Sequence, residues 1–285
     1  MNYDDAAPGK RLASKLRGFL SQSLRRERTT GSQGVLDIEH DPIYNERWNP
    51  SSGPAAFIEF LCAAIPDGDV YLFGGALRDF ALFGREGFSS DLDVVVTCSS
   101  STLSAALPSD VAKKNKFGGF RLKLRRQEID VWAAPDTWAF SEGYFTYRGI
   151  SSLLDTTVIN WDSILLNLRT FDVICKPGYF QDISSRHLDV QFTINPNPHG
   201  ALIKILRYIT LKSVNTVSRR LFCFVKKELL EADGHQIVID ERRKFGDAYI
   251  NEEVLNFFSA SRPRKVTDGS ERIQVWKALF DPQLL

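Results

Sequence analysis

Two aspartates separated by a single residue in a short apolar segment are the first sign of chemistry in this chain. Asp91 and Asp93 belong to the stretch DLDVVV, whose valines are typical of a strand. Alternation along a strand places both carboxylates on one face, roughly 7 Å apart by the rise per residue. Because uncompensated carboxylates are costly to remove from water, the pair predicts a site for a divalent cation.

A third carboxylate lies in a predicted hairpin. The segments GGFRLKL and EIDVWAA have the pattern of two strands around a polar turn, and Asp130 faces away from its apolar neighbours in the second. If this hairpin lies beside the strand that carries Asp91 and Asp93, three carboxylates meet at one spot and can hold two Mg²⁺ against a triphosphate. Taken alone, Asp130 fits a solvated residue on an edge strand.

Two glycines upstream of the aspartates suit a phosphate. Gly74 and Gly75 follow the apolar segment VYLF and precede ALRDFALFG, which has helical spacing. Residues without a Cβ let the backbone approach a phosphate, and a helix N-terminus offers free N–H groups. A Gly-Gly pair occurs in many turns, but strand, Gly-Gly, helix and D-x-D in this order indicate a nucleotide site.

These motifs resemble a known family. GGALRD, DLDVVV, EIDVW, LLDTTVIN and GYFQDIS, followed by ALIKILRYI, are similar in that order to the head and neck of the class II poly(A) polymerase and CCA-adding tRNA nucleotidyltransferase family, within the DNA polymerase beta-like superfamily. The similarity covers about residues 68–215. It implies an α+β fold, with a small mixed sheet in the head and a helical neck and C-terminal region.

The resemblance also implies roles for individual residues. Asp91 and Asp93 would bind two Mg²⁺, with Mn²⁺ as an alternative, and Asp130 would be the third carboxylate, near the attacking 3′-hydroxyl. The residues implied in nucleotide binding are Gly74, Gly75, Arg78, Asp79, Asp155, Asn160, Lys204 and Arg207.

The chain departs from the family at two places. Leu153 and Leu154 stand where the family has two arginines. Gly200, Ala201 and Lys204 stand where CCA-adding enzymes have the acidic pair and the arginine that read the incoming base. The chain therefore lacks carboxylates that could accept hydrogen bonds from base amino groups at these positions.

Three classes of function fit these features. The first is transfer of a nucleoside monophosphate from an NTP to an RNA 3′-hydroxyl, on tRNA or another RNA, with release of pyrophosphate. The second keeps the chemistry but modifies a protein, tRNA or small molecule in a bacterial toxin or defence system. The third is a nucleotide- or RNA-binding regulator without activity, which the presence of all three aspartates disfavours.

Basic residues near the predicted hairpin suggest a track for RNA. Lys123, Arg125 and Arg126 end a basic segment that is interleaved with Phe117, Phe120 and Trp132, a composition that can hold a single-stranded 3′ end. The other cations of this segment are Lys113, Lys114, Lys116 and Arg121. The alternative is an ordinary solvated hairpin tip.

Apolar spacing divides the chain into three expected segments: a basic N-terminal extension (1–45), a nucleotidyltransferase head (46–185) and a helical neck and C-terminal domain (186–285). The basic extension predicts an amphipathic helix that either contacts RNA or a membrane surface, or docks on its own domain. From about Trp161 onward the apolar spacing predicts mostly helices, including one over RIQVWKALF.

The bulk composition suits a globular enzyme. The 285 residues are 43% hydrophobic and 25% charged, with a formal net charge of +1. We expect no membrane span, because no apolar run approaches the roughly 20 residues that one requires. The four cysteines form no C-x-x-C pair, which favours a reducing cytoplasm. Nothing in the sequence identifies a protein partner.

Overall fold

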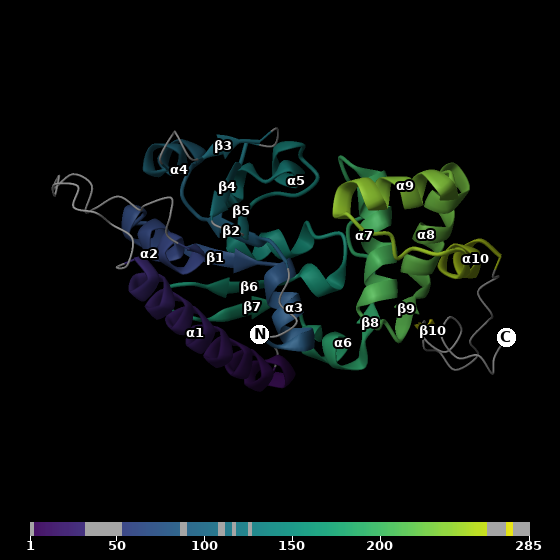
Figure 1. Ribbon diagram of the computed structural model, residues 1–285, viewed down its shortest axis with the longest axis horizontal. Coiled ribbons are helices and arrows are strands. Elements are labelled where there is room, and N and C mark those ends of the chain that lie inside the picture. The colour runs from purple at the N-terminus through teal and green to yellow at the C-terminus, as the bar shows by residue number, and fades with distance from the viewer. Residues whose placement is uncertain are drawn as a thin grey trace. The chain divides into compact units, whose positions relative to one another are not determined.

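The computed structural model describes residues 3–31, 53–85, 90–107, 112–115, 118–124, 127–260 and 272–275 (Figure 1). The chain forms two compact units: unit 1, of Met1–Thr156 and Asp162–Gly178, and unit 2, of Thr157–Trp161 and Tyr179–Leu285. Both units combine helices with strands, which confirms the α+β class. The domain boundaries expected from the sequence stay a prediction.

Unit 1 is built on a seven-stranded sheet in the order β3-β4-β5-β2-β1-β6-β7. Its strands are β1 (Val70–Phe73), β2 (Leu92–Val96), β3 (Lys113–Lys114), β4 (Phe120–Leu124), β5 (Gln127–Ala133), β6 (Ile164–Asn167) and β7 (Val173–Cys175). Neighbours in this sheet pair antiparallel except β2 and β5, which pair in parallel. The predicted hairpin is β4 and β5, and it lies beside β2 as expected.

Helices cover this sheet. They are α1 (Tyr3–Gly31), α2 (Pro54–Ala64), α3 (Gly75–Phe83), α4 (Ser100–Ala106) and α5 (Trp138–Ser141), with short 3₁₀ helices η1 (Ala134–Asp136), η2 (Ile150–Asp155) and η3 (Asn160–Asp162). Helix α3 packs on β1, β2 and β6, and α4 packs on β5. Helix α1 contacts α2 and β7 and buries Leu12 and Leu16. These contacts agree with the alternative in which the N-terminal helix docks on its own domain.

The two faces of the central strands are buried differently. On one face, Val94, Ile129 and Val131 are fully buried. On the other, Val95 packs with Ala134 and Leu153. Because Asp93 and Val95 are two residues apart on β2, the aspartate lies on the face that residues 134–155 partly cover.

Unit 2 is mainly helical (Figure 1). Its helices are α6 (Tyr179–Ser185), α7 (Pro198–Leu211), α8 (Arg219–Glu231), α9 (Gly234–Phe245) and α10 (Glu252–Ala260), and its strands are β8 (His187–Leu188), β9 (Thr216–Ser218) and β10 (Arg272–Gln274). The strands form a small sheet in the order β10-β9-β8. Helix α8 packs on both α7 and α10.

The expectation of mostly helical structure after Trp161 is wrong at several places. Residues 164–167 and 173–175 are β6 and β7 of the main sheet, and residues 272–274, predicted to open a helix, form β10. Strand β6 reads ILLN and is buried at every position, so it lacks the alternation that marks a half-buried strand. A short run that is buried at every position is compatible with a helix or a strand, and hydrogen-bonded pairing with neighbouring strands made this one a strand.

A search of the described helices finds none that is both long and apolar enough to cross a membrane.

Candidate nucleotidyltransferase site

A row of charged side chains crosses the unit 1 sheet at one level. The register pairs Asp93 of β2 with Asp130 of β5. On the far side of Asp130 come Arg121 of β4 and then Lys113 of β3. Directly paired residues project from the same face of a sheet. Two carboxylates and two cations are therefore consecutive across four strands.

A second row lies two residues away on the same face. Asp91 directly precedes β2, and the β2–β5 register extended by one residue brings it beside Glu128, which pairs with Lys123 of β4. Glu128 was not among the residues predicted from the sequence, although its position two residues before Asp130 puts it on that face. The face thus carries four carboxylates, those of Asp91, Asp93, Glu128 and Asp130.

Arg121 binds Asp130 with two hydrogen bonds. Its Nε donates to Oδ1 at 2.8 Å and its Nη2 to Oδ2 at 2.6 Å. This parallel fork is the strong form of an arginine–carboxylate pair. Its Nη1 also lies 3.8 Å from Oε2 of Glu128. The hydrogen bonds to Asp130 raise the pKa of the guanidinium, which stays charged.

Asp91 belongs to the acidic face, the name used here for the carboxylates of Asp91, Asp93, Glu128 and Asp130. Partial burial raises the pKa of its carboxyl, and the charges of Glu128 and Asp130 raise it further, while Arg121 acts in the opposite direction. Since like charges destabilise the ionised form, an added cation at this place would be favourable.

The face offers Mg²⁺ suitable ligands without a closed metal site. Carboxylate oxygens are the ligands that Mg²⁺ prefers, and Asp91, Asp93 and Asp130 share one face. Among the described residues, however, no three His, Cys, Asp or Glu side chains form a group that could hold a metal ion. The expected convergence of three carboxylates is not reached in this arrangement, in which Arg121 takes both oxygens of Asp130.

Gly74 is required by the backbone between β1 and α3. Its φ is 63°, a left-handed conformation that side chains with a Cβ rarely adopt, and it caps α3. Its N–H donates to the carbonyl of Ile164 at 3.0 Å. Gly75 begins the helix and would meet only ordinary contacts if it had a Cβ. The first N–H groups of α3 begin at this turn.

Arg78 and Asp79, predicted to bind nucleotide, are buried inside unit 1. Arg78 donates from Nε to Asp79 at 2.8 Å, from Nη2 to Ser90 Oγ at 3.2 Å, and from Nη1 to Asp162. The Ser90 hydroxyl donates to Asp79. Because Ser90 immediately precedes Asp91, this network ties the start of β2 to α3. The nucleotide contacts stay a prediction, and the observed role is to position the acidic strand.

The LLDTTVIN motif divides between core and surface. Leu153 and Leu154 are buried in apolar clusters of unit 1, so arginines could not replace them without loss of packing. Asp155 is exposed in the same unit, with Oδ1 2.9 Å from Nζ of Lys176.

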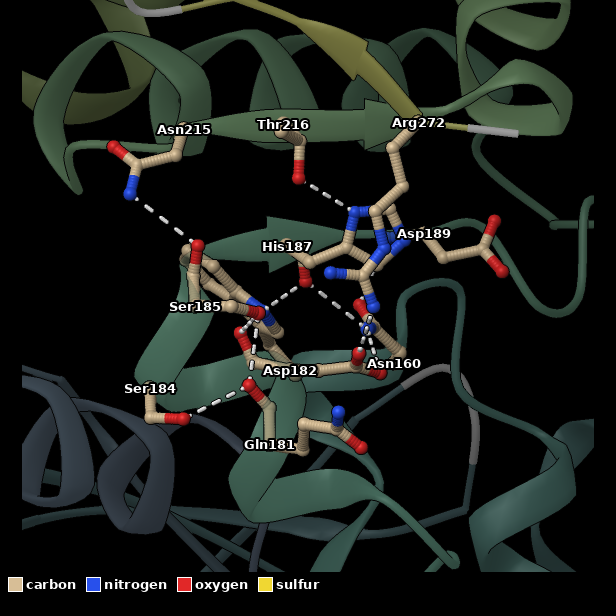
Figure 2. Close-up of polar contacts among 11 residues, drawn as sticks. Asn160, Gln181, Asp182, Ser184, Ser185, His187, Asp189, Asn215, Thr216 and Arg272 are labelled. Atoms are coloured by element: carbon tan, nitrogen blue, oxygen red, sulfur yellow. Dashed lines mark hydrogen bonds and ion pairs between the residues drawn. The ribbon is translucent and has the colours of Figure 1, made fainter. Parts of the chain in front are cut away.

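Asn160, of the same motif, is buried at the centre of a hydrogen-bond network in unit 2 (Figure 2). Its Nδ2 donates to Asp182 at 2.9 Å and to the carbonyl of His187 at 3.2 Å. Its Oδ1 accepts from the N–H of Asp189 at 2.9 Å. The amide therefore ties segment 157–161 to α6 and β8, and a nucleotide contact by it stays a prediction.

Two predicted nucleotide contacts lie one turn apart on α7 and differ in environment. Lys204 is exposed. Arg207 donates from Nη1 to Glu241 at 2.5 Å, and its guanidinium lies 4.1 Å from the ring centroid of Phe245. Glu241 is fully buried and also accepts from the N–H groups of residues 249 and 250. Arg207 therefore has a structural role in unit 2, whereas Lys204 lies with its Nζ 5.6 Å from the ring centroid of Tyr208 and its nucleotide contact stays a prediction.

The start of α7 explains why the acidic base-reading pair is missing. Asn197 caps the helix by accepting from the N–H of Gly200 at 2.9 Å. A Cβ at Gly200 would come within 2.4 Å of the Asn197 side chain. Ala201 is buried. An acidic pair at these positions would clash with the cap and bury a charge.

Of the predicted RNA contacts, Lys123 is exposed on the face of the acidic cluster. Arg125 and Arg126 lie outside the described residues.

Comparison with solved structures identifies the fold as that of nucleotidyltransferases, in particular CCA-adding enzymes. A CCA-adding enzyme in apo form has a TM-score of 0.53 and 18% identity over 77% of this chain and 54% of that one. The Thermotoga maritima enzyme complexed with tRNA has a TM-score of 0.52 and 19% identity over 78% and 53%. A CCA-adding enzyme with ATP has a TM-score of 0.52 and 18% identity over 75% and 52%. The chain spans about half the length of these proteins. No family model and no curated protein sequence matches it.

Arg207→Met should destabilise unit 2. The substitution keeps the apolar stem but leaves the buried Glu241 carboxylate with two backbone donors and no counter-charge, at a cost of about 2–4 kcal/mol. Lys204→Met on the same helix is the matched control and should change the free energy of unfolding by less than about 0.5 kcal/mol. Urea denaturation followed by circular dichroism measures both, and equal effects would contradict the structural role of Arg207.

His187 should make unit 2 sensitive to acid. Burial and the charge of Arg272 lower the pKa of its imidazole, whose Nδ1 lies 2.8 Å from Thr216 Oγ1 (Figure 2). The unfolded chain therefore binds the proton more tightly, so stability is full above about pH 6.5 and falls below it, by at most about 1.4 kcal/mol per pH unit. Denaturation at pH 7.5, 6.5 and 5.5 should show a smaller slope for His187→Gln and the wild-type slope for the exposed control His235→Gln.

Proposed function

We propose that the protein is a metal-dependent nucleotidyltransferase that moves a nucleoside monophosphate from an NTP to the 3′-hydroxyl of an RNA and releases pyrophosphate. The observation that carries the proposal is the register of β2 and β5, which pairs Asp93 with Asp130, while Asp91 lies two residues before Asp93. Structures with the same fold are described as complexes of CCA-adding enzymes with ATP and with tRNA.

The acidic face is the proposed metal site. Asp91 and Asp93 would hold Mg²⁺ or Mn²⁺, with Asp130 as a further ligand. When bound, the metal lowers the pKa of the acceptor hydroxyl and neutralises charge on the departing pyrophosphate.

The chain's own groups position the reactants. The turn at Gly74 and the first N–H groups of α3 suit the triphosphate, since they present donors and the positive end of a helix dipole. The acceptor's 3′ oxygen forms a bond to the α-phosphorus while the bond from that phosphorus to the pyrophosphate oxygen breaks. The proton of the acceptor 3′-hydroxyl is transferred to a carboxylate or to water on the same face. Arg78 and Asp79 act indirectly by holding the start of β2.

Base selection should be less strict than ordered addition of C, C and A requires. Gly200 and Ala201 offer no side-chain acceptors for a base. The acceptor is therefore proposed as RNA in general, with tRNA as one example.

Asp93→Asn should abolish transfer without unfolding the protein. The substitution keeps the shape but removes a metal ligand, so we expect a loss of about a hundredfold or more. Relief of repulsion with Asp130 should leave the thermal midpoint unchanged or higher. The assay incubates purified protein with each labelled NTP and total cellular RNA, and the exposed variant Asp67→Asn is the control. Retained activity in Asp93→Asn would refute the metal assignment. If the label appeared in protein or in a small molecule, that molecule and not RNA would be the acceptor.

Loss of two lysines from the acidic face should weaken RNA binding. Lys113 and Lys123 are exposed beside the row of carboxylates, where a 3′ end would bring its phosphates. In Lys113→Gln/Lys123→Gln the salt dependence of RNA affinity should flatten by roughly one unit of slope per lost phosphate contact. The control is Lys10→Gln/Lys15→Gln on α1. If only the α1 variant flattens the slope, the track runs along α1 instead.

A further inference from the structure

Both oxygens of Asp130, a proposed metal ligand, are held by a cation of the chain. Arg121 donates to Oδ1 at 2.8 Å and to Oδ2 at 2.6 Å, so the guanidinium faces the carboxylate edge that a metal would use. The register places Asp93 directly on the other side of Asp130. Arg121 is thus an arginine that contacts the acidic row directly.

The acidic face needs a positive charge when no metal is bound. Asp93, Glu128 and Asp130 lie on the adjacent strands β2 and β5, and Asp91 directly precedes β2, so these like charges repel one another. The positive charge of Arg121 reduces this repulsion at two carboxylates, since its guanidinium forms two hydrogen bonds with Asp130 and lies 3.8 Å from Glu128.

The geometry also allows the Arg121 guanidinium to move away from Asp130. The Arg121 side chain is 56% exposed, while that of Asp130 is 21% exposed. A long, solvated arginine on β4 can turn toward water at low cost, whereas the short carboxylate stays on the face. The pair can therefore open without a change in the sheet.

We propose that Arg121 is an exchangeable counter-ion of the acidic face: it holds Asp130 in the metal-free protein and must release it before Asp130 can ligate a metal. The inference rests on the proposed function and adds a positioning residue to it. Arg121 touches neither the reacting atoms nor the metal in this scheme. It acts through Asp130 by setting the metal concentration at which the third carboxylate becomes a ligand.

Lys123 provides a matched control for this role. It lies two residues from Arg121 on the same strand and the same face, and it pairs in register with Glu128. Loss of either cation changes the general charge of the face by the same amount, but only Arg121 forms the fork on Asp130.

The test measures binding of Mn²⁺ alone by isothermal titration calorimetry on the full chain. Arg121→Met should bind Mn²⁺ roughly three- to tenfold more tightly than wild type, since the metal no longer competes with a forked ion pair that solvent partly screens. Lys123→Met should give a smaller gain. In an Asp130→Asn background the extra gain of Arg121→Met over Lys123→Met should vanish.

Equal gains from the two cation variants, or a gain that persists with Asp130→Asn, would overturn the counter-ion role. Asp130-dependent tightening in a protein that transfers no labelled NTP would support the role and defeat the proposed activity. Transfer by wild type without any specific effect of Arg121 would defeat the role alone. Failure of every variant to bind Mn²⁺ would defeat both.

Discussion

The candidate site depends on the parallel pairing of β2 with β5. Side chains alternate along a strand, so a shift of one residue would turn Asp130 away from Asp93 and expose its apolar neighbours. Ile129 and Val131 prevent that shift because they are fully buried on the opposite face. Burial of apolar side chains on one side of the sheet therefore determines which charges meet on the other.

Two arginines, the buried Arg78 and the partly buried Arg207, hold the surroundings of predicted ligands in place. Arg78 joins α3 to the residues that precede β2, and Arg207 joins α7 to Glu241 of α9. A buried ion pair adds little net stability, but loss of one partner leaves a charge uncompensated, which favours a single arrangement. For both arginines the sequence implies nucleotide contacts, which stay a prediction, because a motif does not distinguish a residue that touches a ligand from one that supports it.

Regular periodicity made several elements predictable. The alternation in residues 118–134 predicted the β4–β5 hairpin, and the helical spacing of ALIKILRYI predicted the middle of α7. Strands β6 and β7 were missed, since β6 is buried on both faces and carries no alternation. Glu128 could have been found from its position two residues before Asp130, but a lone glutamate at a hairpin has no motif to mark it.

The sequence by itself determined the fold class, the D-x-D strand, the glycine turn and the neighbouring hairpin, because each is a local pattern of side-chain type and spacing. Only the tertiary structure decided which of those residues face solvent and which carboxylates share a face. It also decided that Arg121 forks onto Asp130, while Arg78 is buried and Arg207 pairs with the buried Glu241. These outcomes depend on strand register and on packing between segments far apart in the chain, and no local pattern encodes the partner of a charged side chain.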